Sequence, residues 1–217
     1  MYSIRELFRR CLCGECPLCS WPAVAGDLCT RCEALVRCVN SSSQERDGCS
    51  VVAATYYAPP GDRLMRAFKQ GGQLNHAGLF ARLLWTAMRS HHSALPALAA
   101  LVPIPSDVRA ARRRGFNPAG EIAVELSRLS RVPVRRLWLT RTRTGESQKS
   151  LDRVARRRSV SDLYRCDIRL PDVWVGVVDD VTTTGSTLEA AACALRAAGA
   201  RGVVGLVGAK TPAPDVA

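Results

Sequence analysis

Two adjacent carboxylates, Asp179 and Asp180, precede a run of hydroxyl residues in the stretch 175–188, which reads VGVVDDVTTTGSTL. The apolar residues from Val173 to Val178 predict a buried parallel strand that ends at the acid pair. Open α/β sheets bind ligands at the carboxyl ends of such strands. Because carboxylates accept hydrogen bonds, the pair suits the vicinal hydroxyls of a sugar or a hydrated Mg²⁺.

The hydroxyl-rich turn after the acid pair leads directly into a predicted helix. Its apolar face begins at Leu188, and Gly199 is placed to end it. Unpaired amides and the dipole at a helix start favour a phosphate, and a glycine lets the backbone approach it. A capping hydroxyl in an ordinary strand-turn-helix is the alternative, but capping leaves the two carboxylates unexplained. The residues expected to face the phosphate are Thr183, Thr184, Gly185, Ser186 and Thr187.

A second junction that suits an anion follows the candidate strand 99–104. Arginines separate this strand from a predicted helix for which Asn117 is a good N-cap. Lys69, at the end of a predicted helix that stops at Gly71 and Gly72, could also face an anion. A solvated basic loop and a lysine held by the helix dipole are the alternatives. The loop residues concerned are Pro105, Ser106, Arg112, Arg113 and Arg114.

Eight of the ten cysteines lie before residue 50. Two Cys-x-x-Cys pairs separated by nine residues could enclose Zn²⁺ tetrahedrally, which predicts a small structural zinc knuckle. The surplus cysteines Cys11, Cys13, Cys38 and Cys49 could replace any chosen ligand, and unligated thiols are the alternative. The predicted ligands are Cys16, Cys19, Cys29 and Cys32.

The composition is that of a folded, basic protein. Apolar residues make up 47% of 217, so disorder is not expected, and the formal charge of +12 is carried almost entirely by arginine. This charge suits phosphate-rich partners, although genomic bias towards arginine explains it equally well. The chain has no run of 18 apolar residues and no secretory leader, so we expect a soluble, cytoplasmic protein without membrane insertion.

Several further elements are expected along the chain. The residues 76–88 predict an amphipathic helix, and 134–139 predict a short strand. The polar segment 140–149 suits either a mobile lid beside an active site or plain surface, and a basic helix follows it. The residues 202–207 predict a closing strand that pairs beside the strand carrying the acid pair.

The DDVTTTGST stretch resembles the phosphoribosyl pyrophosphate (PRPP) signature of type I phosphoribosyltransferases. In that family the acidic pair holds the ribose hydroxyls and the following loop holds the 5′-phosphate. The resemblance assigns the first role to Asp179 and Asp180, and the second to the residues 183–187. In members that act on 6-oxopurines a carboxylate serves the base where this chain has Thr183, so such an acceptor is disfavoured.

The cysteine pairs, VPIPSD followed by RRRGFNPAGEIA, and DDVTTTGST together resemble the ComF family of competence-associated phosphoribosyltransferase-like proteins. The resemblance implies an α/β fold, a parallel sheet flanked by helices of the type I phosphoribosyltransferase kind. It also implies a zinc-binding extension and linker at 1–48 and a phosphoribosyltransferase-like domain at 49–217. A pyrophosphate loop is implied near 103–107. Independently of the resemblance, we expect Arg112 to Arg114, Lys69 or the arginines of the predicted lid to stabilise a pyrophosphate. Family members are linked to the uptake of transforming DNA.

The first hypothesis is an Mg²⁺-dependent transferase that displaces pyrophosphate from PRPP, with Asp179 and Asp180 as the catalytic residues. The second is a PRPP sensor whose zinc knuckle and arginines contact single-stranded DNA or a DNA-uptake helicase. A zinc ribbon that binds nucleic acid and carries an α/β domain is the third. The acceptor of the phosphoribosyl group is not identified by the residues.

Overall fold

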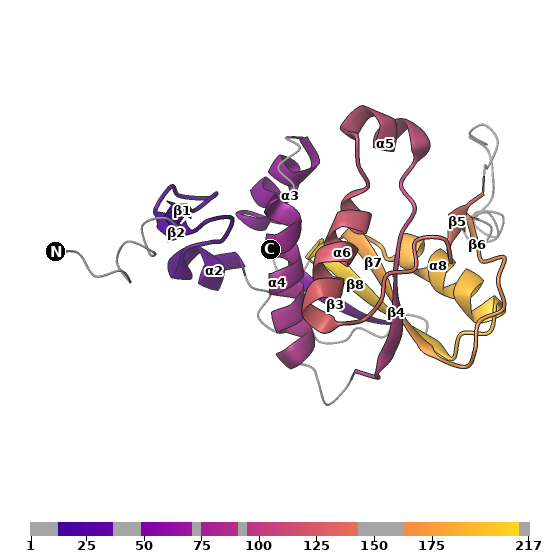
Figure 1. The fold of residues 1–217 in the computed structure, drawn as a ribbon. Helices are drawn as coiled ribbons and strands as arrows, with labels where there is room; N and C mark the ends of the chain where they lie inside the picture. Colours follow the sequence, from indigo (N-terminus) through magenta and orange to yellow (C-terminus); the bar gives the residue numbers. More distant parts are fainter. Residues whose placement is uncertain (1–12, 37–48, 71–74, 91–94, 143–162, 213–217) are drawn as a thin grey trace.

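A four-stranded parallel sheet forms the centre of the molecule (Figure 1). The computed structural model describes residues 13–36, 49–70, 75–90, 95–142 and 163–212. The strand order across the sheet is β3 (Ser50–Tyr56), β8 (Gly202–Lys210), β7 (Trp174–Thr182) and β4 (Leu98–Pro103). The expectation of an α/β fold with a parallel sheet flanked by helices is therefore confirmed.

Helices cover both faces of this sheet. One face carries α3 (Gly61–Gln70), α4 (Asn75–Ser90) and α6 (Pro118–Ser130), and the other carries α8 (Ser186–Ala197). Successive strand residues point to opposite faces, so Val178 packs in the first core cluster and Val177 in the second. Both cores are built from buried aliphatic side chains, and they hold the strand ends at a fixed edge.

The connection from β7 through α8 to β8 follows the sequence expectation. Gly199, with φ 110°, lies just after the helix, and its N–H donates to the Arg196 carbonyl. The N–H of Ala200 donates to the Leu195 carbonyl, which completes a Schellman end. β8 then pairs in parallel with β7, as predicted.

Strand β7 extends further than the sequence suggests. The acid pair was expected at its end, but β7 continues to Thr182, which pairs with Lys210 of β8. The neighbour on the other side, β4, ends its pairing at Pro103 opposite Val178. The acid pair thus lies in the part of the sheet beyond β4 where only β3, β8 and β7 continue, so one edge of β7 is no longer covered by a strand.

The predicted strand 134–139 is wrong. Only Val134 forms a bridge, to Leu101 of β4, and the N–H of Arg135 donates to the Leu101 carbonyl. Leu137 is 86% exposed, whereas Val134 and Leu139 pack in the two cores, so the segment is anchored at its ends without pairing along the sheet. The next two residues form β5 (Thr140–Arg141), which pairs with β6 (Tyr164–Arg165). The remainder of the predicted lid and the basic helix after it fall within 143–162, outside the described residues.

The N-terminal cysteine unit packs against the sheet domain. It consists of β1 (Cys13–Glu15), β2 (Pro22–Val24) and α2 (Thr30–Val36). Arg82 of α4 forms an ion pair with Asp27 and donates to the Gly26 carbonyl at 3.1 Å. The Thr55 hydroxyl donates to the Val36 carbonyl at 2.6 Å. The boundary expected near residue 48 falls in 37–48, outside the described residues.

Among the described helices, none combines the length and the apolar character needed to cross a bilayer.

Candidate active site and metal centre

The two carboxylates of the acid pair lie on opposite faces of β7. Asp179 shares its face with Val177 and α8, whereas Asp180 faces the side of α3. Each is fixed by the backbone: the Asp180 N–H donates to Asp179 Oδ1 at 2.8 Å, and the Val181 N–H donates to Asp180 Oδ1 at 2.9 Å. Asp179 is buried, while Asp180 is partly exposed.

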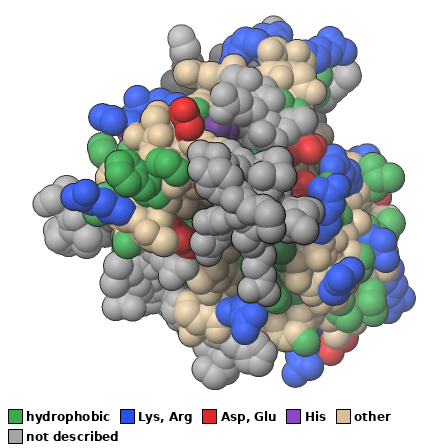
Figure 2. Space-filling model, turned by 60° about the vertical axis from the view of Figure 1, so that its left-hand side comes forward, with side chains coloured by type: hydrophobic (Ala, Val, Ile, Leu, Met, Phe, Trp, Pro, Cys, Tyr) green, Lys and Arg blue, Asp and Glu red, His purple; other side chains and the backbone are tan. Residues whose placement is uncertain are grey.

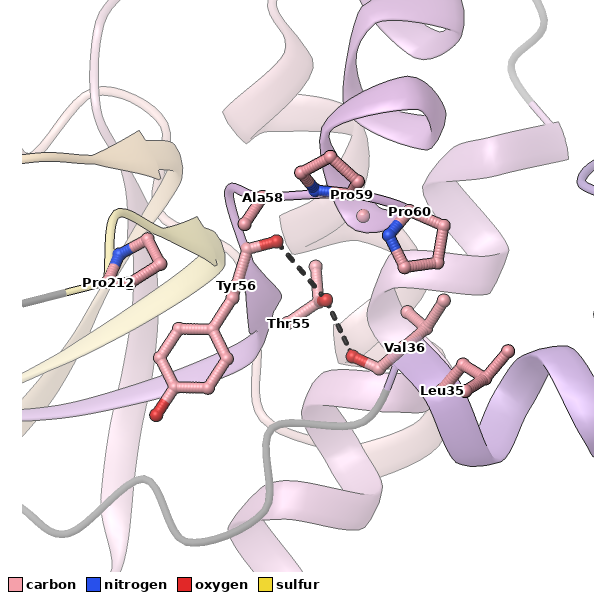
Figure 3. A pocket seen from close by; sticks show the side chains of 9 residues that line it. Leu35, Val36, Thr55, Tyr56, Ala58, Pro59, Pro60 and Pro212 are labelled. Atoms are coloured by element: carbon pink, nitrogen blue, oxygen red, sulfur yellow. Dashed lines mark hydrogen bonds between the residues drawn. The ribbon is translucent and has the colours of Figure 1, made fainter. Parts of the chain in front are cut away.

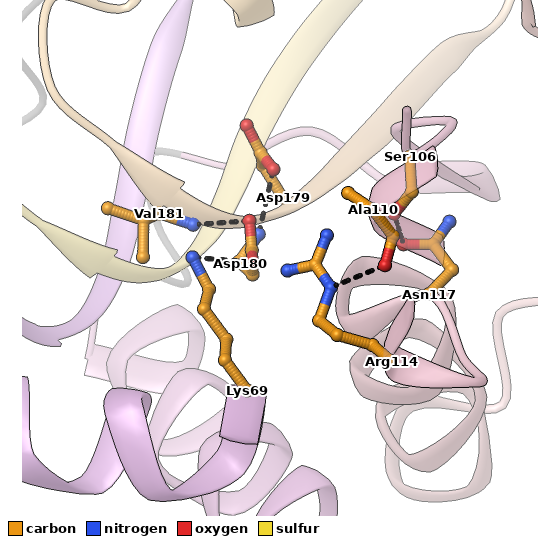
Figure 4. Close-up of polar contacts among 8 residues, drawn as sticks. All are labelled: Lys69, Ser106, Ala110, Arg114, Asn117, Asp179, Asp180 and Val181. Atoms are coloured by element: carbon orange, nitrogen blue, oxygen red, sulfur yellow. Dashed lines mark hydrogen bonds and ion pairs between the residues drawn. The ribbon is translucent and has the colours of Figure 1, made fainter. Parts of the chain in front are cut away.

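Two basic side chains approach Asp180 from different elements (Figure 4). Lys69 Nζ, from the end of α3, lies 2.8 Å from Asp180 Oδ2. Arg114, the last residue of α5 (Val108–Arg114), extends towards the same space from the opposite side and is half-buried. Its Nε donates to the Ala110 carbonyl at 3.2 Å. The structure therefore brings together Asp180 and two of the predicted anion contacts.

The electrostatics differ between the two acids. Burial raises the pKa of Asp179 well above its ordinary value, the charge of Asp180 raises it further, and Lys69 partly opposes both. Burial also raises the pKa of Tyr164, with Asp179 adding to the shift and Arg141 opposing it. A buried acid with a perturbed pKa at the edge of a sheet is typical of functional sites.

The turn after β7 has the backbone that the sequence suggests. Gly185 adopts φ 84° and starts α8, and an added Cβ would meet no atom within 4 Å. The space above this residue is therefore open. Thr183 and Thr184 are exposed, and the Thr184 hydroxyl lies 3.1 Å from that of Ser186. The first amides of α8 have no acceptor within the helix, which leaves donors at this edge.

The arginine loop is held at its base by Asn117. Its side chain was expected to cap α6, but no capping hydrogen bond forms. Instead, its Oδ1 accepts from the Ser106 hydroxyl at 2.8 Å, and its Nδ2 donates to the Ile104 carbonyl at 2.9 Å. Arg112 and Arg113 are exposed, so of the three predicted arginines Arg114 is the one that faces the acid pair.

Sequence reasoning missed two residues near the site. Arg141 lies opposite Tyr164 in the β5–β6 ladder and lowers the pKa of Asp107, although the backbone N–H of Ala110 has the larger effect. Tyr164 is buried within the core beside α8. Tyr164 lies near Asp179 and Arg141 lies beside Tyr164, yet the two are separated in sequence by the residues 143–162. The one signal available was the alternation of Arg and Thr at the start of the predicted lid.

A pocket of about 140 Å³ lies elsewhere, between the cysteine unit and the start of α3 (Figure 3). It is lined by Leu35 and Val36 of α2, by the turn 58–61 and by Pro212. The Thr55 hydroxyl, bonded to the Val36 carbonyl, forms its floor. Tyr56 also lines this pocket, but none of its lining residues is acidic or basic, so the acid pair remains the candidate for chemistry.

The four predicted cysteine ligands come together. Their sulfur atoms all lie within 4.8 Å of one another, and Cys19 Sγ is 3.7 Å from Cys29 Sγ and 3.5 Å from Cys32 Sγ. Four thiolates about 2.3 Å from a tetrahedral Zn²⁺ are separated by roughly 3.8 Å, so the geometry fits a metal ion such as zinc. Burial acts to raise the pKa of Cys16, but the N–H groups of Cys29, Leu18 and Cys19 outweigh it and lower the pKa to about 6.

The fold and the site define an α/β protein with a parallel sheet, an acid pair at its carboxyl edge and a four-cysteine cluster. No protein-family model matches the chain. It is 31% identical over 169 residues to Competence protein F of Haemophilus influenzae, covering 75% of this chain and 73% of the relative. It is 30% identical over 193 residues to DNA utilization protein YhgH of Escherichia coli, covering 87% and 80%. The chain belongs to the ComF family.

Proposed function

We propose that the chain binds PRPP at the acid pair and acts as a type I phosphoribosyltransferase. The observation that carries this proposal is the order of strand, turn and helix at one edge of the sheet. Asp179 and Asp180 end the buried part of β7, and the turn 183–185 leads directly into α8 with Gly185 in the left-handed region. The acid pair can accept hydrogen bonds from sugar hydroxyls, and the helix start beside it can bind a phosphate. Together they match a phosphorylated sugar.

Each face of β7 would bind one half of the ligand. On the side of Asp179 lies the start of α8, whose first-turn amides would hold the 5′-phosphate, with the long 3.5 Å contact from the Ser186 N–H to Thr184 Oγ1 giving way. On the side of Asp180 lie Lys69 and Arg114, which would hold the pyrophosphate. The ribose hydroxyls would meet the carboxylates between these halves. This division accounts for why both faces of one strand carry an acid.

The residues present do not form a preassembled Mg²⁺ site. Asp179 Oδ1 and Asp180 Oδ1 accept backbone hydrogen bonds, and Asp180 Oδ2 is paired with Lys69. Mg²⁺ prefers several oxygen ligands in near-octahedral geometry, and it commonly reaches proteins with substrate phosphates. We therefore assign any Mg²⁺ to the PRPP complex, where it would enter with the substrate phosphates.

The chain's own groups can assist transfer through charge. As the bond between the ribose and pyrophosphate breaks, positive charge grows on the sugar and negative charge on the leaving group. In the proposed complex Asp180 would contact the sugar, and Lys69 and Arg114, which lie on the same face of β7, would contact the pyrophosphate. Fixed groups of this kind stabilise a transition state more than they stabilise a ground state. The exposed Thr183 offers a hydroxyl rather than a carboxylate, which disfavours a 6-oxopurine acceptor.

Titration calorimetry with PRPP tests the proposal directly. Wild-type protein should bind PRPP, and Asp179→Asn with Asp180→Asn should lose at least tenfold in affinity. Exchanging Asp167 and Asp172, two exposed acids away from the site, for Asn provides the matched control. Unchanged binding in the site variant contradicts the assignment. A screen for pyrophosphate release with a panel of nucleobases then identifies the acceptor.

A second candidate function is a non-catalytic PRPP sensor that contacts single-stranded DNA or a helicase during DNA uptake. The names of the relatives, which refer to competence and DNA utilization, favour a role of this chain in that process. Exposed Arg109, Arg112 and Arg113 on α5 could contact a phosphate backbone. Figure 2 shows Lys and Arg side chains in several separate places of the visible face rather than along one continuous track.

Turnover and salt dependence separate the two candidates. An enzyme releases pyrophosphate in the presence of its acceptor. A sensor that binds DNA shows no turnover with any base, and its DNA affinity falls steeply with salt. For such a sensor, Arg112→Gln with Arg113→Gln should reduce the DNA affinity and make it depend less steeply on salt concentration. PRPP affinity should be unchanged.

A further inference from the structure

The helix α5 is attached to the molecule in an unusual way. None of its residues is buried, so no apolar packing fixes its position. It projects from the sheet on two connecting segments, residues 104–107 before it and 115–117 after it (Figure 1). Asp107 caps its start, accepting from the N–H groups of Arg109 and Ala110 at 3.0 and 3.1 Å. These contacts shape α5 internally but do not attach it to the body.

The attachment comes from Asn117, which joins the two connecting segments. Its Nδ2 donates to the Ile104 carbonyl, and its Oδ1 accepts from the Ser106 hydroxyl. Both bonds cross from the segment after α5 to the segment before it. Asn117 occupies the N-cap position of α6, where its side chain would ordinarily accept from the helix, yet it bonds to the opposite segment instead. We call this pair of bonds the Asn117 clasp.

The residues between α5 and Asn117 connect the clasp to the acid pair. Arg114 extends towards Asp180. Gly115, with φ 80°, ends α5 and reverses the chain. The ring of Phe116 packs on that of Phe68 with centroids 5.5 Å apart, and Phe68 directly precedes Lys69. The segment Arg114 to Asn117 therefore ties both basic groups that approach Asp180 to one short stretch of backbone.

We propose that Asn117 is a positioning residue that, through the clasp, holds Arg114 beside Asp180, where the pyrophosphate of PRPP would lie. This inference rests on the proposed function for the identity of the ligand. The Ser106 hydroxyl hydrogen is already donated to Asn117, so Ser106 acts through the clasp and not as a side-chain donor to pyrophosphate. Arg114 supplies the charge-assisted contact, and Asn117 sets its place.

Separate ligands for the two halves of the site test the inference. Inorganic pyrophosphate and ribose 5-phosphate are titrated into wild type, Asn117→Ala, Ser106→Ala and Arg114→Gln. We expect pyrophosphate affinity to fall about tenfold in Asn117→Ala and Arg114→Gln, with ribose 5-phosphate affinity within twofold of wild type. Ser106→Ala combined with Asn117→Ala should lose no more than Asn117→Ala alone, because both remove one clasp.

Two other outcomes of these titrations would overturn the inference. Equal losses for both ligands in Asn117→Ala indicate a general structural role. A loss in Arg114→Gln without a loss in Asn117→Ala shows that Arg114 is held by something else.

Hydrogen exchange tests the clasp without any ligand. The Gly115 and Ala111 amides, which close α5, should exchange faster in Asn117→Ala, with the α6 amides unchanged. Unchanged exchange in α5 overturns the inference. If wild type binds neither ligand, the proposed function fails, and the clasp is judged by exchange alone.

Discussion

Lys69 Nζ forms an ion pair with Asp180 Oδ2 at 2.8 Å, which joins the end of α3 to the exposed end of β7. The same aspartate is adjacent to Asp179, whose carboxyl group is buried. Lys69 is thus the cation that balances two neighbouring acids. Both partners keep some contact with solvent, so the pair is screened and its energy is modest.

Replacing Lys69 by Met should weaken both stability and PRPP binding. The expected loss of stability is about 1 kcal/mol, because Asp180 then lies beside Asp179 without its ion-pair partner. Lys69→Arg should retain most of both properties. A double-mutant cycle with Asp180→Asn, measured by urea denaturation, should return a coupling of similar size. Additive losses would show that the pair does not interact.

Asp179→Asn should stabilise the protein at neutral pH while weakening PRPP binding. Because burial raises the pKa of Asp179, the native state holds a proton more tightly than the unfolded state, whose carboxyl titrates near pH ~3.9. Wild-type stability therefore falls as pH rises from about 4 towards the native pKa, and stays lower above it. Asn keeps the acceptor for the Asp180 amide and removes this cost. Denaturation at several pH values should show a gain at pH 7.5 that shrinks towards pH 4.

Gly185→Ala and Gly115→Ala form a matched pair. Both glycines have φ near 80°, at 84° and 80°, and neither has an atom within 4 Å of an added Cβ. Each substitution should cost about 1–2 kcal/mol of stability through backbone strain. Only Gly185→Ala should also weaken ribose 5-phosphate binding, because its Cβ enters the open space above the turn. Calorimetry with ribose 5-phosphate tests this difference. Equal affinities of the two variants would show that the turn is not part of the phosphate site.

Zinc content should depend on the clustered cysteines alone. Cys32→Ser should release the ion, because three thiolates are left, whereas Cys193→Ser, on the surface of α8, should retain one zinc per chain. Removing the metal should also lower the melting temperature, since α2 is bonded to Thr55 of the sheet domain. Elemental analysis and thermal denaturation test both statements. A full zinc content in Cys32→Ser would contradict the cluster.

Local patterns predicted the parts of this molecule that depend on neighbours in sequence. The apolar runs found the sheet strands, and the Cys-x-x-Cys spacing found four sulfurs that meet in space. The turn at Gly185 followed from residue types because a left-handed start of a helix is a local requirement.

Contacts between distant segments were not predictable in the same way. The extension of β7 to Thr182 depends on the length of β8, and the role of Asn117 depends on a partner thirteen residues earlier. The Asn117 side chain forms tertiary hydrogen bonds instead of the local bond that would cap α6. The partnership of Lys69 with Asp180 likewise needs the sheet to bring α3 and β7 together.

The opposite directions of Asp179 and Asp180 limit which molecules can use both acids. The backbone of β7 stands between the two carboxylates, so a compound that contacts both must bend around the edge of this strand that β4 leaves uncovered. A flat, rigid heterocycle can contact only one of them at a time. Under the proposed function, a flexible molecule with a puckered ring and charged groups at either end can therefore meet both acids, which a flat one cannot.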